Sequence, residues 1–222
     1  MANPSSDHVP ILEEFKTSSG ILGWIDVLDV QEMGEERLEK LFSIMSTFSP
    51  SYSTMGFAPG QSVQSVNSIL VGDTLCLAQV DHSIGSQFMT TQTALMFSQL
   101  LFSEDFPHRG VVTVGPYEAK HPKGGLPYII GRAVTNAYKT EKNLKVSGIV
   151  ITENALNLVP AFKNKNIGNE MIRSKSAICG HYFLSSKLHL SVWKKFTDQA
   201  WSTHSYTAAA KTITDQPSDE WI

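Results

Sequence analysis

The spacing of apolar residues in the first third of the chain predicts three elements in succession. A short, mostly apolar run at 21–30 is typical of a β-strand that is covered on both faces. The segment 35–46 predicts an amphipathic helix, because its apolar side chains recur three and four positions apart. Two apolar runs within 62–80 flank the pair Gly72-Asp73 and predict a β-hairpin with a tight turn.

The middle of the chain continues to alternate between helical and strand-like periodicity. We expect a helix at 87–102, a strand at 110–115, a helix at 132–142 and a strand at 146–151. The complete order is strand, helix, hairpin, helix, strand, helix and strand. This order predicts an α+β fold with a ferredoxin-like βαββαβ core, in which helices pack on one face of a mixed or antiparallel sheet.

The remaining segments suggest how the chain is divided. We expect one domain at 18–205, between an N-terminal arm at 1–17 and a C-terminal tail at 206–222. A short helix at 11–16 is an alternative for part of the arm. Within the domain we expect a loop at 48–61, a turn or flap at 121–127, and a late hairpin formed by 177–184 and 188–193.

Composition narrows the class of protein. The 222 residues are 41% hydrophobic and 18% charged, which is normal for one globular domain, and no apolar run approaches the roughly 18 residues of a membrane span. Cys76 and Cys179 lie outside any metal-binding motif, so we expect a cytoplasmic protein in which both are small buried hydrophobes. A net charge of −3 without a basic cluster argues against DNA or RNA partners, and we expect no direct contact with a membrane.

Two carboxylates stand at positions where a sheet could bring them together. Asp26 lies near the end of the first strand, and Asp73 lies in the hairpin turn. Because neighbouring strands are about 5 Å apart, the two acids can meet and hold Mg²⁺ or Mn²⁺. Two such ions can activate an attacking oxygen and stabilise a leaving pyrophosphate. The competing interpretation is that Asp26 caps a strand and Asp73 serves the turn.

A cationic face is expected on the helix at 132–142. Arg132, Thr135 and Lys139 are spaced three and four residues apart, so they share one side near the helix N-terminus. Such a surface suits a phosphate group, for which lysine acts as a point charge without the bidentate fork of arginine. A solvated basic face is the alternative interpretation.

The order of these features resembles the catalytic domain of the class III nucleotidyl cyclases over residues 20–155. The matching stretches are Trp24-Ile25-Asp26-Val27 for the family's Phe-x-Asp-Ile strand, Gly72-Asp73 for its Gly-Asp hairpin turn, Arg109 and Gly115 for its Arg and Gly six residues apart, and Gly131 through Lys139 for its Gly-x-x-Val-Asn-x-Ala-x-Arg helix. Asp29 stands where the family has a turn glycine.

The resemblance implies a role for each matched residue. Asp26 and Asp73, with the carbonyl group of Val27, would bind two metal ions of Mg²⁺ or Mn²⁺. The family's transition-state Asn and Arg fall on Thr135 and Lys139, so both are replaced. In the family one chain supplies the aspartates and another supplies the helix face. A homodimer that binds a nucleoside triphosphate at its interface is therefore implied, with Arg109 and Arg132 as further cations near the nucleotide.

The residues that read the base differ from those of purine cyclases. The two corresponding positions are Ile69 and Tyr128, where purine cyclases have Lys or Glu and Asp or Cys. An apolar and an aromatic residue would leave a purine's polar edge without partners, whereas Tyr128 could stack on or hydrogen-bond a smaller base.

These departures resemble the pyrimidine cyclases of the bacterial antiphage Pycsar system. The resemblance implies conversion of UTP or CTP, with UTP favoured, into a cyclic nucleotide that activates a separate effector. Two other hypotheses stay open at this point. One is a catalytically degenerate cyclase-like protein that binds nucleotide and regulates, and the other is a purine nucleotide cyclase with a rebuilt pocket.

Overall fold

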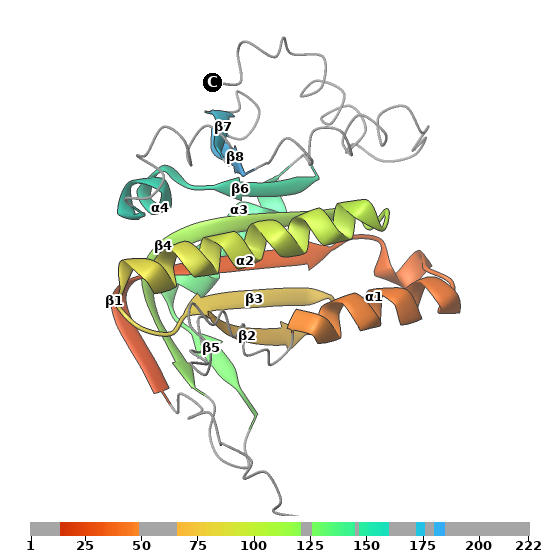
Figure 1. Ribbon diagram of the computed structural model, residues 1–222, viewed down its shortest axis with the longest axis horizontal. Helices are drawn as coiled ribbons and strands as arrows, with labels where there is room; N and C mark the ends of the chain where they lie inside the picture. Colours follow the sequence, from red (N-terminus) through yellow and green to blue (C-terminus); the bar gives the residue numbers. More distant parts are fainter. Residues whose placement is uncertain are drawn as a thin grey trace, which may run out of the picture.

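The computed structural model describes residues 14–48, 66–120, 126–144, 147–159, 172–175 and 180–184, arranged as in Figure 1. The strands are β1 (Glu14–Val27), β2 (Val66–Val71), β3 (Thr74–Gln79), β4 (His108–Lys120), β5 (Tyr128–Ile130), β6 (Gly148–Ile151), β7 (Ile172–Lys175) and β8 (Tyr182–Leu184). The helices are α1 (Glu35–Phe48), α2 (Ile84–Ser103), α3 (Arg132–Asn143) and α4 (Glu153–Leu158), with a short 3-10 turn η1 (Val30–Glu32) after β1.

All of these strands join one mixed sheet. Its order is β2-β3-β1-β4-β6-β8-β7, and β5 pairs with β4 outside this path. Neighbouring strands are antiparallel except β4 and β6, which are parallel. The first four strands, with α1 and α2 between them, form the predicted βαββαβ unit. The α+β class and the ferredoxin-like mixed sheet are therefore confirmed.

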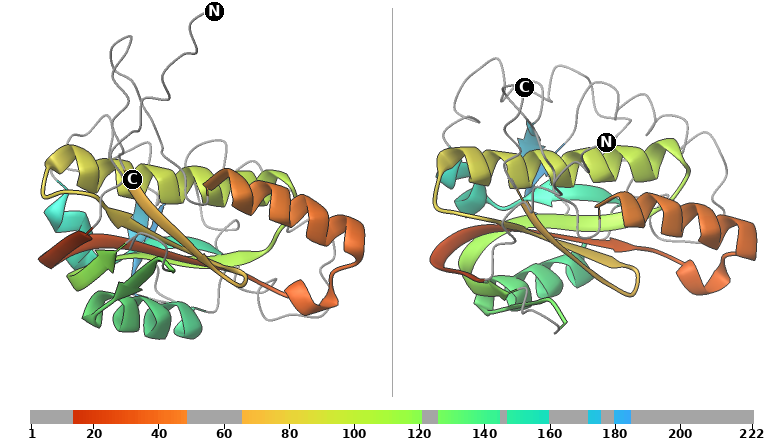
Figure 2. Two further views of the ribbon diagram at one scale, coloured as in Figure 1. Left: turned by 90° about the horizontal axis from the view of Figure 1, so that it is seen from below. Right: turned by 60° about the horizontal axis from the view of Figure 1, so that its bottom comes forward.

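The helices form layers on both faces of the sheet, as Figure 2 shows. The expectation of helices on one face holds for α1, α2 and α4, which contribute to the same apolar cluster. Helix α3 packs on the opposite face, where Ala133 and Ala137 meet Leu22 and Val111. Alternate residues of a strand point to opposite faces, so β1 sends Ile21 and Ile25 to one layer and Leu22 to the other.

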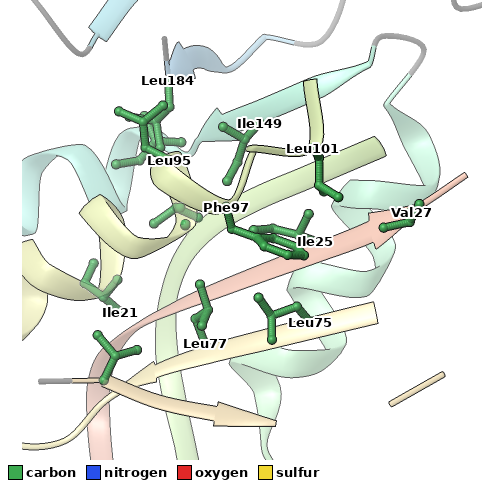
Figure 3. Packing of buried hydrophobic residues seen from close by; sticks show 14 of the residues in the cluster. Ile21, Ile25, Val27, Leu75, Leu77, Leu95, Phe97, Leu101, Ile149 and Leu184 are labelled. Atoms are coloured by element: carbon green, nitrogen blue, oxygen red, sulfur yellow. The ribbon is translucent and has the colours of Figure 1, made fainter. Parts of the chain in front are cut away.

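The larger core lies between the sheet and α2. Figure 3 shows Phe97 and Leu101 of α2 above Ile25 of β1 and Leu75 of β3. Phe97 is fully buried and its ring meets Phe48 of α1 edge-on, with the ring centres 4.9 Å apart. Helix α2 has buried residues around most of its circumference because α1 also covers part of it.

Several predicted elements differ from the structure in extent. Strand β1 begins at Glu14, so the arm and the short N-terminal helix are wrong for 14–17. Its exposed and buried residues alternate there, which is the period of a strand. Residues 128–130 form β5 against β4, an additional strand that the sequence did not predict.

The late hairpin also has different partners. Strand β8 pairs with β6 along one edge and with β7 along the other. Both of its edges are therefore occupied, and neither is left for the predicted second arm of the hairpin. The predicted second arm at 188–193 lies outside the described residues, as do 49–61 of the loop, 121–125 of the flap, Cys179, and the tail at 206–222. Cys76 is buried as expected, and burial raises the pKa of its thiol to about 12.

Candidate active site

The end of β1 meets the β2–β3 turn. The backbone amide of Val27 donates a hydrogen bond to the carbonyl oxygen of Asp73 (3.0 Å), and Asp26 lies directly opposite Thr74 in the β1–β3 register. The turn needs only two residues because Gly72 adopts the left-handed conformation with φ of 61°. The predicted hairpin is thus confirmed, and the turn places Asp73 next to the end of the strand that carries Asp26.

Asp26 is held on two sides. Its Oδ1 accepts a hydrogen bond from the hydroxyl group of Thr74 (2.8 Å), and its Oδ2 faces two cations. The guanidinium nitrogen Nη2 of Arg109 is 3.8 Å from Oδ2, and Nζ of Lys142 is 3.6 Å from it. Asp26 is only 9% exposed, so water screens its carboxylate little from these two positive charges.

Glu141 completes this group from helix α3. Its Oε1 is 2.9 Å from Nη2 of Arg109, and its Oε2 is 3.7 Å from Nζ of Lys142. Burial raises the pKa of Glu141, and the adjacent Asp26 acts in the same direction, whereas Arg109 and Lys142 lower it. Sequence reasoning identified Arg109 but missed Thr74, Glu141 and Lys142.

A signal for Glu141 was present in the sequence. Ala133, Ala137 and Glu141 recur every four residues and form the buried side of α3. A carboxylate in an otherwise apolar stripe is expected to have a cationic partner, because a buried unpaired charge is costly. What the stripe could not reveal is that the partner comes from β4.

The predicted cationic face lies on the side of α3 away from the sheet. Arg132, Thr135 and Lys139 are all exposed, and the hydroxyl group of Thr135 donates to the carbonyl oxygen of Gly131 at 3.4 Å. Gly131 precedes the helix with φ of 143°, and a Cβ atom there would lie 2.5 Å from the carbonyl oxygen of Pro116. Close packing between β4 and the start of α3 therefore fixes where this face begins.

The two expected base-reading residues occupy different parts of the sheet. Ile69 is buried opposite Cys76, and Cys76 in turn lies opposite Trp24 of β1. Tyr128 is half-buried on β5, where it pairs with Lys120 at the far end of β4, and its hydroxyl group is 3.4 Å from Glu118 Oε1. Within one chain, Ile69 on β2 and Tyr128 on β5 therefore lie in different parts of the sheet.

The donor set suits a hard divalent cation. Asp26 and Asp73 provide carboxylate oxygens, and backbone carbonyl groups lie beside them at the turn. Across the residues that the structure describes, no group of three or more His, Cys, Asp or Glu side chains is arranged to hold a metal ion. A cation here would therefore complete its coordination with water and phosphate oxygens, as Mg²⁺ usually does.

The first two residues of β4 serve opposite faces. Arg109 points toward α3, whereas His108 is fully buried against α2, with its ring 4.3 Å from that of Phe102. The imidazole Nδ1 donates to the carbonyl oxygen of Phe106 (3.0 Å), so Nε2 accepts from the hydroxyl group of Ser98 (2.7 Å). Burial lowers the pKa of His108 to about 4, although the bond to Phe106 opposes the shift.

Among the described helices, none is both long enough and apolar enough to cross a bilayer.

No family model matches the sequence, and no curated protein matches it. Solved structures do match. The catalytic core of a rhodopsin-guanylyl cyclase with converted specificity, in complex with ATPαS, superposes with a TM-score of 0.51 at 12% identity over 78% of this chain and 98% of that one. Two structures of the guanylyl cyclase domain of the RhoGC fusion protein from the aquatic fungus Blastocladiella emersonii are also similar. The non-canonical dimer has a TM-score of 0.52 at 12% identity over 80% and 99% of the two chains, and the monomer 0.50 at 14% over 79% and 99%. The chain therefore has the fold of guanylyl cyclase catalytic domains.

Proposed function

We propose that this chain is a metal-dependent nucleotidyl cyclase that acts on a pyrimidine nucleoside triphosphate. One observation carries the proposal: in a cyclase fold, the Val27–Asp73 hydrogen bond of 3.0 Å and the pairing of Asp26 with Thr74 put one acid at the end of β1 and a second in the adjoining β2–β3 turn. The carboxylates of Asp26 and Asp73, together with the carbonyl group of Val27, would hold two ions of Mg²⁺ or Mn²⁺.

The proposed reaction is an intramolecular displacement. The ribose 3′-oxygen attacks the α-phosphorus, the bond to the bridging oxygen of the β-phosphate breaks, pyrophosphate leaves, and the hydroxyl proton passes to solvent. Ions held by Asp26 and Asp73 would supply Lewis acidity for this displacement. Lys139, Arg132 and Arg109 would counter the charge that grows on the phosphates. The Thr135 hydroxyl group would leave the carbonyl oxygen of Gly131 and donate a hydrogen bond to a phosphate oxygen.

Two chains are needed to complete such a site. Thr135 and Lys139 lie half a helical turn away from the buried residues Ala133 and Ala137, so they face away from the sheet that carries Asp26. A second copy can bring its α3 face to the aspartates of the first. We propose a homodimer with two equivalent sites; one matched guanylyl cyclase domain is itself a dimer, although a non-canonical one.

Our proposal for the substrate class rests on the two expected base-reading positions. Ile69 is 5% exposed and offers no polar atom, and the hydroxyl group of Tyr128 lies against Glu118. Neither position supplies the charged side chain that would pair with a purine edge. We favour UTP and then CTP, and we place the cyclic product in cytoplasmic antiphage defence, as a second messenger for a separate effector.

The experiment is a product assay with all four nucleoside triphosphates. The full chain is incubated with Mn²⁺ and each nucleotide, and cyclic products are identified by mass spectrometry. We expect cyclic UMP or cyclic CMP, with activity abolished in Asp26→Ala and Asp73→Ala and retained in Glu14→Gln, which alters an exposed ion pair at the opposite end of β1. Cyclic AMP or cyclic GMP alone would refute the pyrimidine assignment.

A mixing experiment tests the shared site. Asp26→Ala and Lys139→Ala chains are each expected to be inactive. A heterodimer of the two holds one site with both changes and one intact site, so mixing should restore activity. Failure to restore it, while the chains still associate, would contradict a site built from two copies.

The second candidate is a nucleotide-binding regulator without turnover. The replacement of the family's Asn and Arg by Thr135 and Lys139 favours it, as do the two cations beside Asp26. Nucleotide binding without any cyclic product would select this candidate.

A further inference from the structure

Four charged side chains gather at the end of β1 on the face covered by α3. We call Asp26, Arg109, Glu141 and Lys142 the charge cluster. They come from β1, β4 and the last turn of α3, and each acid lies within 4 Å of both cations. Two acids and two bases balance formally, so the cluster has no net charge when all four are ionised.

Arg109 is not shared equally between the two acids. The same nitrogen, Nη2, lies 2.9 Å from Glu141 Oε1 and 3.8 Å from Asp26 Oδ2. The first distance is that of a short ion pair, although it lacks hydrogen-bond geometry, and the second is that of a longer ion pair. The other terminal nitrogen, Nη1, points to the carbonyl oxygen of Leu144 at 3.5 Å, so the end of α3 also draws the guanidinium away from β1.

The strand register alone would place Arg109 differently. Asp26 and Arg109 are direct cross-strand partners in β1 and β4, an arrangement in which opposite charges usually pair closely. Glu141 is fully buried on the α3 stripe that otherwise contacts the sheet through Ala133 and Ala137. Burying a carboxylate there is costly unless it binds a cation, and its closest cation is Arg109.

We propose that Glu141 is a positioning residue that holds Arg109 off Asp26 and so keeps Asp26 Oδ2 open to a divalent cation. This inference rests on the metal site of the proposed function. Lys142 also approaches Oδ2, but its side chain is 47% exposed and can turn to solvent, whereas the Arg109 side chain is 13% exposed and is enclosed by its neighbours. Glu141 is therefore the group that decides where the confined cation rests.

The variant Glu141→Gln keeps the shape of the side chain and removes its charge. Arg109 would then move toward Asp26 and add an uncompensated positive charge beside the metal. Loss of a supporting partner of this kind typically weakens metal binding by about 10- to 100-fold. Removing Arg109 as well should reverse most of the loss, because the competing cation is then absent.

The test measures the ion alone, without nucleotide. Tb³⁺ serves as a hard, oxygen-seeking probe whose emission is sensitised by Trp24, two residues before Asp26 on the same face of β1, and Mn²⁺ is used to displace it. We expect Glu141→Gln to weaken the binding of both ions about tenfold or more. In the double variant Arg109→Gln/Glu141→Gln, the affinity for both ions should return to within about threefold of that of the parent chain. Glu14→Gln removes one carboxylate far from the site as a matched control, and it should leave the affinity for both ions unchanged.

Arg109→Gln alone is the second variant, and it does not depend on whether Glu141→Gln folds. It removes the confined cation that competes for Asp26 Oδ2, so it should bind Mn²⁺ as tightly as the parent chain or more tightly. Weaker binding in Arg109→Gln, or unchanged binding in Glu141→Gln, would overturn the role of Glu141. A parent signal that Asp26→Asn does not reduce would instead refute the metal site itself, and with it the proposed function.

Discussion

Acidification should destabilise the folded chain through one buried histidine, His108. The imidazole is fully buried, accepts from Ser98 and donates to Phe106, an arrangement that suits the neutral ring. Burial lowers its pKa from 6.5 to about 4. Because the unfolded chain binds the proton first, the stability from this shift is fully present above about pH 6.5 and is lost as the pH falls toward 4.

The size of the effect follows from the two pKa values. A difference of about 2.5 units corresponds to a maximum loss of about 3 kcal/mol in the free energy of unfolding. At about pH 5 the unfolded state is almost fully protonated at this site and the folded state is not, so about 2 kcal/mol should already be gone. Below about pH 4 the contribution levels off, since both states are then protonated.

Urea unfolding followed by circular dichroism between about pH 7.5 and 5 measures this loss. His108→Gln keeps a donor and an acceptor but cannot titrate, so its stability should fall about 2 kcal/mol less than that of the parent over the same range. Equal slopes in the parent and in His108→Gln would refute the assignment of the pH dependence to His108.

Two further predictions concern the site and its support. Lys142→Gln should tighten Mn²⁺ binding several-fold, because the ammonium group 3.6 Å from Asp26 Oδ2 competes with the ion; displacement of Tb³⁺ measures this, and weaker binding would contradict it. Gly131→Ala should lower stability by about 2 kcal/mol or more, since φ is 143° and the new Cβ would lie 2.5 Å from the carbonyl oxygen of Pro116. Thermal unfolding compares it with Gly34→Ala, where a Cβ meets nothing within 4 Å, and equal melting temperatures would show that the turn can relax.

Local pattern was sufficient for the elements that carry the candidate site. The β2–β3 hairpin follows from two apolar runs around Gly72-Asp73, and α1 and α2 follow from helical spacing. These signals depend only on residues that are close together in the chain, so a single sequence is enough to recognise them. The meeting of Asp26 with the turn was also expected, because adjacent strands of one sheet leave few other arrangements.

Long-range arrangement was harder to predict. The side of the sheet that α3 covers depends on the path between β4 and β6, and the buried stripe of α3 is compatible with either face. Glu141 shows the same difficulty at the level of one residue, since its partner Arg109 lies on another element. The start of β1 was missed because polar residues alternate with Phe15 and Thr17, which are buried only once β4 lies alongside.

The opposite orientations of His108 and Arg109 have a consequence for alignment of the central strands. If β4 slipped by one residue against β1, the guanidinium group would enter the apolar layer beside Phe102, and an imidazole would face Glu141. Each of these changes would leave a buried charge without a partner, so electrostatics as well as apolar packing select the observed register. Insertions or deletions near residue 108 should accordingly be tolerated far less than equal changes at the Lys120 end of the same strand.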